Sequence, residues 1–365
     1  MFQVPVHRAR RAAVPHTRLV GDLFDSPAAT AGGTGDLQSS MSDSQRLAGD
    51  VGDLADATGA AIGRDYARFG LAPPVEHLSA GHPVRRGWQD GVARFRHRSR
   101  PARLHVHEWL SLRLDAWLRG IAFDELHVTP HYLRQIHPDV CPVTRRALTH
   151  GHGRDTDAVV VRLRADVGYE LGNLAVVSSS AARLLLRLQS GLCSWLASHD
   201  PQVPFGSDDD LAPEERSRLL VLATLATPLP HAAVRDLPLL VLPPNRLHVV
   251  NGVQGLQAVL TMTVVQPAFG RRVADLASRI SSAAGRRAFH AFMHTLLARR
   301  VEGRLQHADG NSRHGLEDAW RHPLVVQRWR QFAAAIDEAT VKGLVDAGAR
   351  DAQGRGASSG QGYSR

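Results

Sequence analysis

Four side chains in one short loop could hold a metal ion. His150, His152, Asp155 and Asp157 follow the pattern His-x-His-x-x-Asp-x-Asp, and two glycines lie among them. Imidazole nitrogens suit Zn²⁺ and carboxylate oxygens suit Mg²⁺, while one histidine could remain as a general base. The alternative is a polar loop whose histidines face water, because a glycine-rich loop does not preorganise metal ligands by itself.

Two other pairs of candidate ligands lie outside this loop. Cys141 and His137 could join the loop histidines in a structural zinc site, although their spacing matches no common zinc motif; the alternative is a buried, unreactive thiol. His290 and His294 have the four-residue spacing that lets two imidazoles of one helix share a zinc ion. Because no glutamate follows His290, we expect these two histidines to be partly buried beside neighbouring apolar residues.

Arginine supplies almost all of the positive charge. The chain of 365 residues has a formal net charge of +9, and Lys342 is its only lysine. A guanidinium group can bind two phosphate oxygens at once, so this composition favours nucleic acid as a partner, whereas the codon bias of a GC-rich genome is the alternative explanation. The segment RFRHRSRPAR predicts an extended basic arm that begins at Arg94. The arginines predicted to contact phosphate are Arg94, Arg96, Arg98, Arg162, Arg164 and Arg183.

A hairpin followed by a helix would position the residues of the 150–157 loop. After a turn or knuckle at Cys141, the runs AVVVRLR and LAVVS predict two strands, and SSAARLLLRLQSGL predicts a helix. Gly172 and Asn173 are typical of a tight turn, and the Asn173 amide can both donate and accept hydrogen bonds across it.

This segment, at about residues 138–186, resembles the HNH endonucleases, a family of ββα-metal nucleases. The matching residues are Cys141-Pro142-Val143-Thr144, Arg162, Gly168-Tyr169, the run from Gly172 to Ser178, and Arg183. In that family an Asp of the strand and an Asn or His of the helix hold a divalent ion against the scissile phosphate. The matching positions here are Val161 and Ala182, which cannot coordinate a metal. The resemblance therefore implies a scaffold that keeps Asn173 as its structural brace and has lost its usual metal ligands.

The expected fold is mainly helical with a small α+β insert, in which the ββα module precedes a larger helical unit. Helical spacing of apolar residues predicts helices over 214–226, 252–264, 270–281, 284–302, 314–320 and 323–342. The expected parts are a disordered, low-complexity stretch (1–60), a basic arm with an amphipathic helix (61–135), the HNH-like module (136–200), a helical domain (201–345) and a disordered tail (346–365).

The chain has the features of a cytoplasmic protein. Its two cysteines are too few for a disulfide framework, and no apolar run approaches the ~18 residues that a membrane helix needs. We expect no secretory signal and no membrane partner. Met41 precedes an acidic stretch and is an alternative start of translation.

Three hypotheses follow. The first is a nucleic-acid-associated protein whose HNH-like module has lost metal-dependent cleavage, so that no cofactor is expected. The second is a divergent active endonuclease that uses Mg²⁺ or Zn²⁺ in the 150–157 loop. The third is a non-catalytic structural or protein-interaction protein in which the hairpin and helix are only a folding element. Clustered arginines beside the hairpin favour the first hypothesis.

Overall fold

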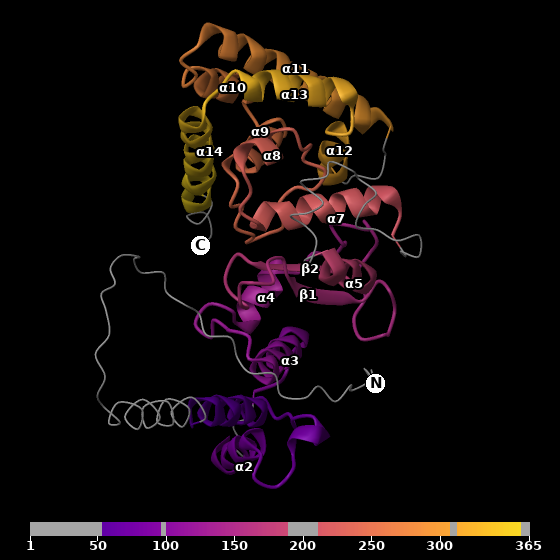
Figure 1. Ribbon diagram of the computed structural model, residues 1–365, viewed down its shortest axis with the longest axis vertical. Helices are drawn as coiled ribbons and strands as arrows, with labels where there is room; N and C mark the ends of the chain where they lie inside the picture. Colours follow the sequence, from indigo (N-terminus) through magenta and orange to yellow (C-terminus); the bar gives the residue numbers. More distant parts are fainter. Residues whose placement is uncertain (1–52, 96–99, 189–210, 307–311, 359–365) are drawn as a thin grey trace, which may run out of the picture. The chain divides into compact units, whose positions relative to one another are not determined.

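The computed structural model describes residues 53–95, 100–188, 211–306 and 312–358 (Figure 1). The chain divides after Pro101 into two compact units. The described residues are mainly helical and contain one two-stranded sheet, as the sequence predicts. In the part of the chain that the structure describes, no helix combines the length and the apolar character that a membrane span requires. Arg96, Arg98 and the alternative start at Met41 lie outside the described residues.

The first unit pairs a helix over residues 53–68 with α2 (Pro83–Phe95), and a short 3-10 helix, η1 (Val75–His77), lies between them in the chain. The two helices approach closely at glycines. A Cβ atom added to Gly87 would lie 1.8 Å from the Ala60 carbonyl oxygen, and one added to Gly63 would lie 2.0 Å from the Val84 carbonyl oxygen. The backbones can pack at this distance only because both residues lack a side chain.

Two expectations about this unit were wrong. The stretch expected to be disordered to residue 60 is helical from residue 53. Its alanines favour a helix, and Ile62 and Tyr66 of the same helix are buried. The basic arm was expected to be extended from Arg94, but Arg94 and Phe95 form the last turn of α2.

The second unit begins with two helices, α3 (Leu104–Arg119) and α4 (Pro130–Ile136). The strands β1 (Ala158–Arg162) and β2 (Leu174–Ser178) follow, and then α5 (Ser179–Leu188). The strands are antiparallel, with Ala158 opposite Ser178 and Arg162 opposite Leu174. The order of hairpin and helix is the one that the sequence predicts, whereas α4 was not predicted.

The small sheet is covered on both faces. Leu174 and Val176 point to a core that includes Tyr132 and Leu133 of α4. Ala175 and Val177 point to a second, larger core. Side chains of a strand alternate between faces, and both faces are covered here. Every residue of β2 is therefore buried, and its first four residues are apolar.

The remaining helices build the larger core (Figure 1). They are α7 (Pro213–Ala226), α8 (His231–Arg235), α9 (Gly252–Thr263), α10 (Phe269–Ala277), α11 (Ala283–Gln306), α12 (Ser312–Ala319), α13 (Pro323–Ala334) and α14 (Glu338–Ser358). Its largest fully buried side chains are Phe289, Phe292, Trp320, Trp329 and Phe332.

Several helix boundaries in this region differ from the predicted ones, and the two largest differences lie toward the C-terminal end. The single helix expected over 323–342 is two helices, because Asp337 accepts a hydrogen bond from the Thr340 amide (2.8 Å) at the start of α14. The segment 346–358, expected to be disordered, continues α14. In this segment Ala347 is buried, and a Cβ atom on Gly348 would lie 2.3 Å from Val259 of α9.

The ββα module and the helices that follow it share one core. Cys141, Val143 and Val161 belong to the same hydrophobic cluster as the tryptophans of the helical part. Arg218 of α7 donates a hydrogen bond to the Val143 carbonyl (2.6 Å). Residues 102–365 therefore form one compact unit. The domain boundaries expected at residues 136 and 201 do not divide it into separate units.

Candidate functional site

Asn173 holds the hairpin with three hydrogen bonds from its buried side chain. Its Oδ1 accepts from the Arg164 amide (2.9 Å), and its Nδ2 donates to the carbonyl oxygens of Arg164 (3.2 Å) and Gly168 (3.1 Å). Gly172 before it has φ of +88°, and a Cβ atom there would lie 2.7 Å from His248 Cβ. The Asn173 side chain therefore ties together the two ends of the loop between β1 and β2.

The two positions at which the resemblance would place metal ligands are filled with hydrocarbon. Val161 is 8% exposed and Ala182 is 6% exposed, and both belong to the larger core. Nearby, the Cys141 sulfur accepts hydrogen bonds from the backbone amides of Ser178 (3.2 Å) and Thr144 (3.5 Å). Cys141 is fully buried, and it joins no group of three potential ligands among the described residues.

The side chain of Asp157, one of the four candidate metal ligands, holds the 150–157 loop together by hydrogen bonds. One oxygen of Asp157 accepts hydrogen bonds from the backbone amides of His152, Gly153 and Arg154 (2.7–3.2 Å), and the other accepts from the Thr149 hydroxyl (2.6 Å). The Thr149 hydroxyl, together with the three amides, holds the pKa of Asp157 below its ordinary value although burial opposes this.

The other three candidates of the loop have separate surroundings. Asp155 pairs with Arg183 of α5 (2.7 Å), while His152 is exposed. The His150 ring lies 5.5 Å from the ring of His137. The structure therefore does not gather His150, His152, Asp155 and Asp157 into one ligand set.

The arginines predicted to contact phosphate have different surroundings. Arg162 donates to the carbonyl oxygens of Ala165 and Val167 (2.9 Å each), and Arg164 pairs with Asp166 (2.5 Å), so both close the loop between the strands. Arg94 is exposed on α2. Arg183 is half exposed beside Asp155, and Arg187 lies one turn later on the same exposed face of α5.

A group of three potential metal ligands lies at the ends of α3 and α4. His105 Nδ1 is 3.1 Å from Glu108 Oε2, and His137 Nε2 is 3.0 Å from Glu108 Oε1. The ligand atoms all lie within 4.8 Å of one another. His105 and Glu108 are one turn apart near the start of α3, and His137 is the residue that ends α4.

The surroundings of this group favour a charged carboxylate. Burial raises the pKa of Glu108, but the interactions of this carboxylate with His137 and His105 outweigh burial, and the pKa lies below its ordinary value. An open pocket of about 470 Å³ adjoins the group and is lined by His105, His137 and His150, among other residues.

Sequence reasoning missed this group because its third member depends on α4. The spacing of His105 and Glu108 on a helix could have suggested two ligands on one face. His137 was considered only with Cys141, and its approach to Glu108 follows from how α4 packs on α3.

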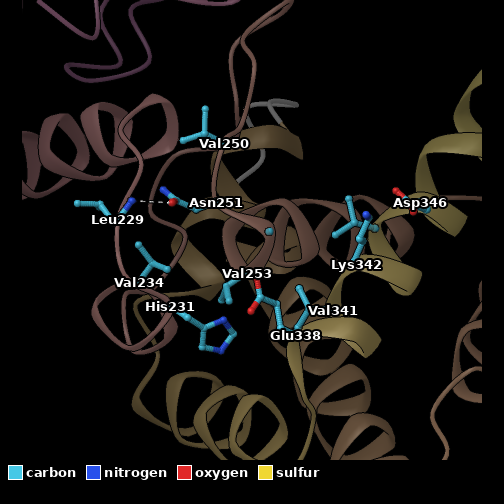
Figure 2. Close-up of a pocket in the computed structure, with 12 residues that line it drawn as sticks. Leu229, His231, Val234, Val250, Asn251, Val253, Glu338, Val341, Lys342 and Asp346 are labelled. Atoms are coloured by element: carbon cyan, nitrogen blue, oxygen red, sulfur yellow. Dashed lines mark hydrogen bonds between the residues drawn. The ribbon is translucent and has the colours of Figure 1, made fainter. Parts of the chain in front are cut away.

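A second pocket, of about 300 Å³, lies between the start of α9 and α14 (Figure 2). Figure 2 shows Val253 and Val341 beside the more polar His231, Glu338 and Lys342, and no ion pair joins these three polar side chains to one another. The lining is more apolar than polar, and among the described residues it includes no group of three potential metal ligands. His290 and His294 of α11 have their rings stacked 6.3 Å apart and belong to no group of three ligands in the described parts of the chain.

Comparisons of this chain with protein families, with curated proteins and with solved structures find no match.

Proposed function

We propose that this chain is a nucleic-acid-associated protein whose HNH-like module binds phosphate backbones without cleaving them. The observation that supports the proposal is the state of the hairpin and helix. The brace at Asn173 is intact, whereas Val161 and Ala182 place buried hydrocarbon where the resemblance expects metal ligands. A hard divalent cation needs oxygen or nitrogen ligands, which valine and alanine side chains lack. These two positions therefore cannot hold the ion that metal-dependent cleavage in that family requires.

The outer face of α5 is the part of the module that would contact phosphate. Arg183 and Arg187 lie four residues apart, so their side chains project from the same side of the helix. Both are exposed. Phosphate contacts of this kind give affinity without sequence specificity and weaken steeply as the salt concentration rises.

The first experiment measures cleavage and binding on the same purified full-length chain. Supercoiled plasmid and a labelled duplex are incubated with Mg²⁺, Mn²⁺ or Zn²⁺ to detect nicking, and with EDTA across a salt series to measure affinity. We expect binding in EDTA and no nicking with any of the metals. Nicking that is lost in His152→Ala would favour an endonuclease that uses the 150–157 loop.

A pair of charge-reversal variants then locates the binding surface. We expect Arg183→Glu with Arg187→Glu to weaken binding and to reduce the slope of log affinity against log salt by about 0.9 for each phosphate that these arginines neutralise in the unmodified chain. The matched control is Arg271→Glu with Arg279→Glu, which changes the charge equally at two exposed positions in and just after α10. If both double variants lose the same affinity, the binding is explained by the net positive charge of the chain alone, and the proposal fails.

A further inference from the structure

We propose that His105, Glu108 and His137 form a binding site for a divalent transition metal, with Zn²⁺ as the best match. The site is distinct from the positions at Val161 and Ala182, and it does not depend on nucleic-acid binding. Imidazole nitrogens favour Zn²⁺ over Mg²⁺, and two histidines with one carboxylate are a known donor set for zinc.

The distances between the ligand atoms suit an ion placed among them. Zinc lies about 2.0–2.2 Å from nitrogen and oxygen ligands, so two ligands of a tetrahedral ion are about 3.3 Å apart. The two histidine nitrogens lie 3.1 Å and 3.0 Å from the two oxygens of Glu108. Small side-chain rotations are therefore enough to bring all three groups to one ion.

His137 provides the second, independent observation. Its side chain is only 9% exposed, and its Nε2 is buried. Although this nitrogen lies 3.0 Å from Glu108, it makes no hydrogen bond of acceptable alignment. Buried polar atoms nearly always have a well-directed partner, and a metal ion between His137 and Glu108 would give this nitrogen one.

Regular structure holds all three ligands in place. Glu108 is on the second turn of α3, and Trp109 beside it donates a hydrogen bond to the Val128 carbonyl (2.7 Å), just before α4. Thr129 caps the start of α4 by accepting from the Tyr132 amide (3.2 Å). These contacts fix α4 against α3 and so fix His137 opposite Glu108, which is the preorganisation that a metal site requires.

The adjoining pocket gives the ion an open side. Three protein ligands leave the fourth position of a tetrahedral zinc ion available, and the pocket beside His105 and His137 would give water or a small ligand access to it. His150 lines the same pocket with its ring 5.5 Å from that of His137. His150 could therefore contact a molecule bound in the pocket.

The test is a metal titration of the untagged, full-length chain after treatment with a chelator. Co²⁺ is used as the spectroscopic probe, because a tetrahedral site gives intense visible absorption, and Zn²⁺ is then added in competition. We expect one Co²⁺ site that Zn²⁺ displaces, and a rise in Tm on adding Zn²⁺.

Three variants assign that site. His137→Ala and the milder Glu108→Gln should each weaken Zn²⁺ binding at least about 10-fold, the lower end of the loss seen when even the supporting residues of metal sites are changed. His127→Ala is the control, because His127 also pairs with an acidic residue three positions away (Asp124, 2.8 Å) but belongs to no group of three. Melting curves in EDTA show that each variant is folded.

Two results would overturn the proposal. One is the absence of a displaceable tetrahedral Co²⁺ site in the unmodified chain. The other is equal Zn²⁺ affinity in the unmodified chain, His137→Ala and Glu108→Gln, which would place any bound zinc elsewhere among the histidines. In either case the three side chains would be a polar group that only stabilises α3 against α4.

Discussion

At the scale of single residues, the side chain of Asn173 holds the loop between the two strands. We expect Asn173→Ala to lower the free energy of unfolding by about 2–4 kcal/mol, because three hydrogen bonds disappear and buried backbone groups are left without their partners. Chemical denaturation measures the change. Asn245→Ala is the control, since Asn245 is exposed and its amide makes one hydrogen bond, to the Gln135 carbonyl. A decrease as small as that of the control would contradict the role of Asn173 as the brace.

The lowered pKa of Asp157 predicts how the stability of the folded chain depends on pH. Its pKa is lowered in the folded chain, so its contribution is fully present above the pKa of an unfolded aspartate, about 3.9, and is lost as the pH falls through the folded value. Asp157→Asn should cost about 1–3 kcal/mol at neutral pH, because the bonds to the charged oxygens weaken. The difference from the unmodified chain should shrink below about pH 4.

Urea unfolding at a series of pH values measures this difference. Asp275→Asn changes an exposed aspartate of α10 and serves as the control. A difference between Asp157→Asn and the unmodified chain that stays constant from neutral pH to pH 3 would show that the charge of Asp157 does not stabilise the loop.

At the scale of elements, close packing at glycines holds the helix pair of the first unit together. Gly87→Ala would place a methyl group 1.8 Å from the Ala60 carbonyl oxygen, so the helices must separate. We expect a loss of about 1–3 kcal/mol or more, and faster hydrogen exchange over residues 53–68. Gly270→Ala is the matched control because it has open space within α10, where alanine should be neutral or stabilising by up to about 1 kcal/mol. Unchanged exchange in Gly87→Ala would mean that the two helices are not packed as described.

The elements that could be predicted from the sequence have strong local signals. β-Branched runs separated by Gly172 and Asn173 indicate a hairpin, and the structure confirms both strands and α5. The helix α4 was missed because it is only seven residues long, although Thr129 and Pro130 form a usual helix start. The approach of His137 to Glu108 could not be predicted, since it depends on tertiary packing rather than on spacing in the chain.

At the scale of the whole molecule, buried charges link the knuckle around Cys141 to α12. Arg145 of the knuckle pairs with Glu317 (3.2 Å) and Asp318 (2.8 Å) of α12, and Glu317 also accepts from the Leu242 amide (3.0 Å). The Glu317 side chain is 1% exposed. Glu317→Ala leaves the Leu242 amide without its acceptor and leaves Arg145 with Asp318 as its remaining partner, so we expect the substitution to cost about 1–3 kcal/mol.

The Glu317→Ala substitution should also affect the hairpin, which lies far from α12 in the chain. Since the ββα module and the helices share a core, hydrogen exchange in Glu317→Ala should accelerate in β1 and β2 as well as in α12. Glu302→Ala removes an exposed pair with Arg299 and should change stability by less than about 1 kcal/mol. Acceleration confined to α12 would indicate that the module and the helical part open independently.

The buried thiol of Cys141 can be used to measure how often the core around it opens. A thiol that is fully buried and held by two backbone amides cannot meet an alkylating reagent until the surrounding strands separate. Cys193 is the only other cysteine, so in a Cys193→Ser background every alkylated molecule is one in which the core around Cys141 has been exposed at least once. The rate of labelling then measures how often that core opens under native conditions, without any denaturant.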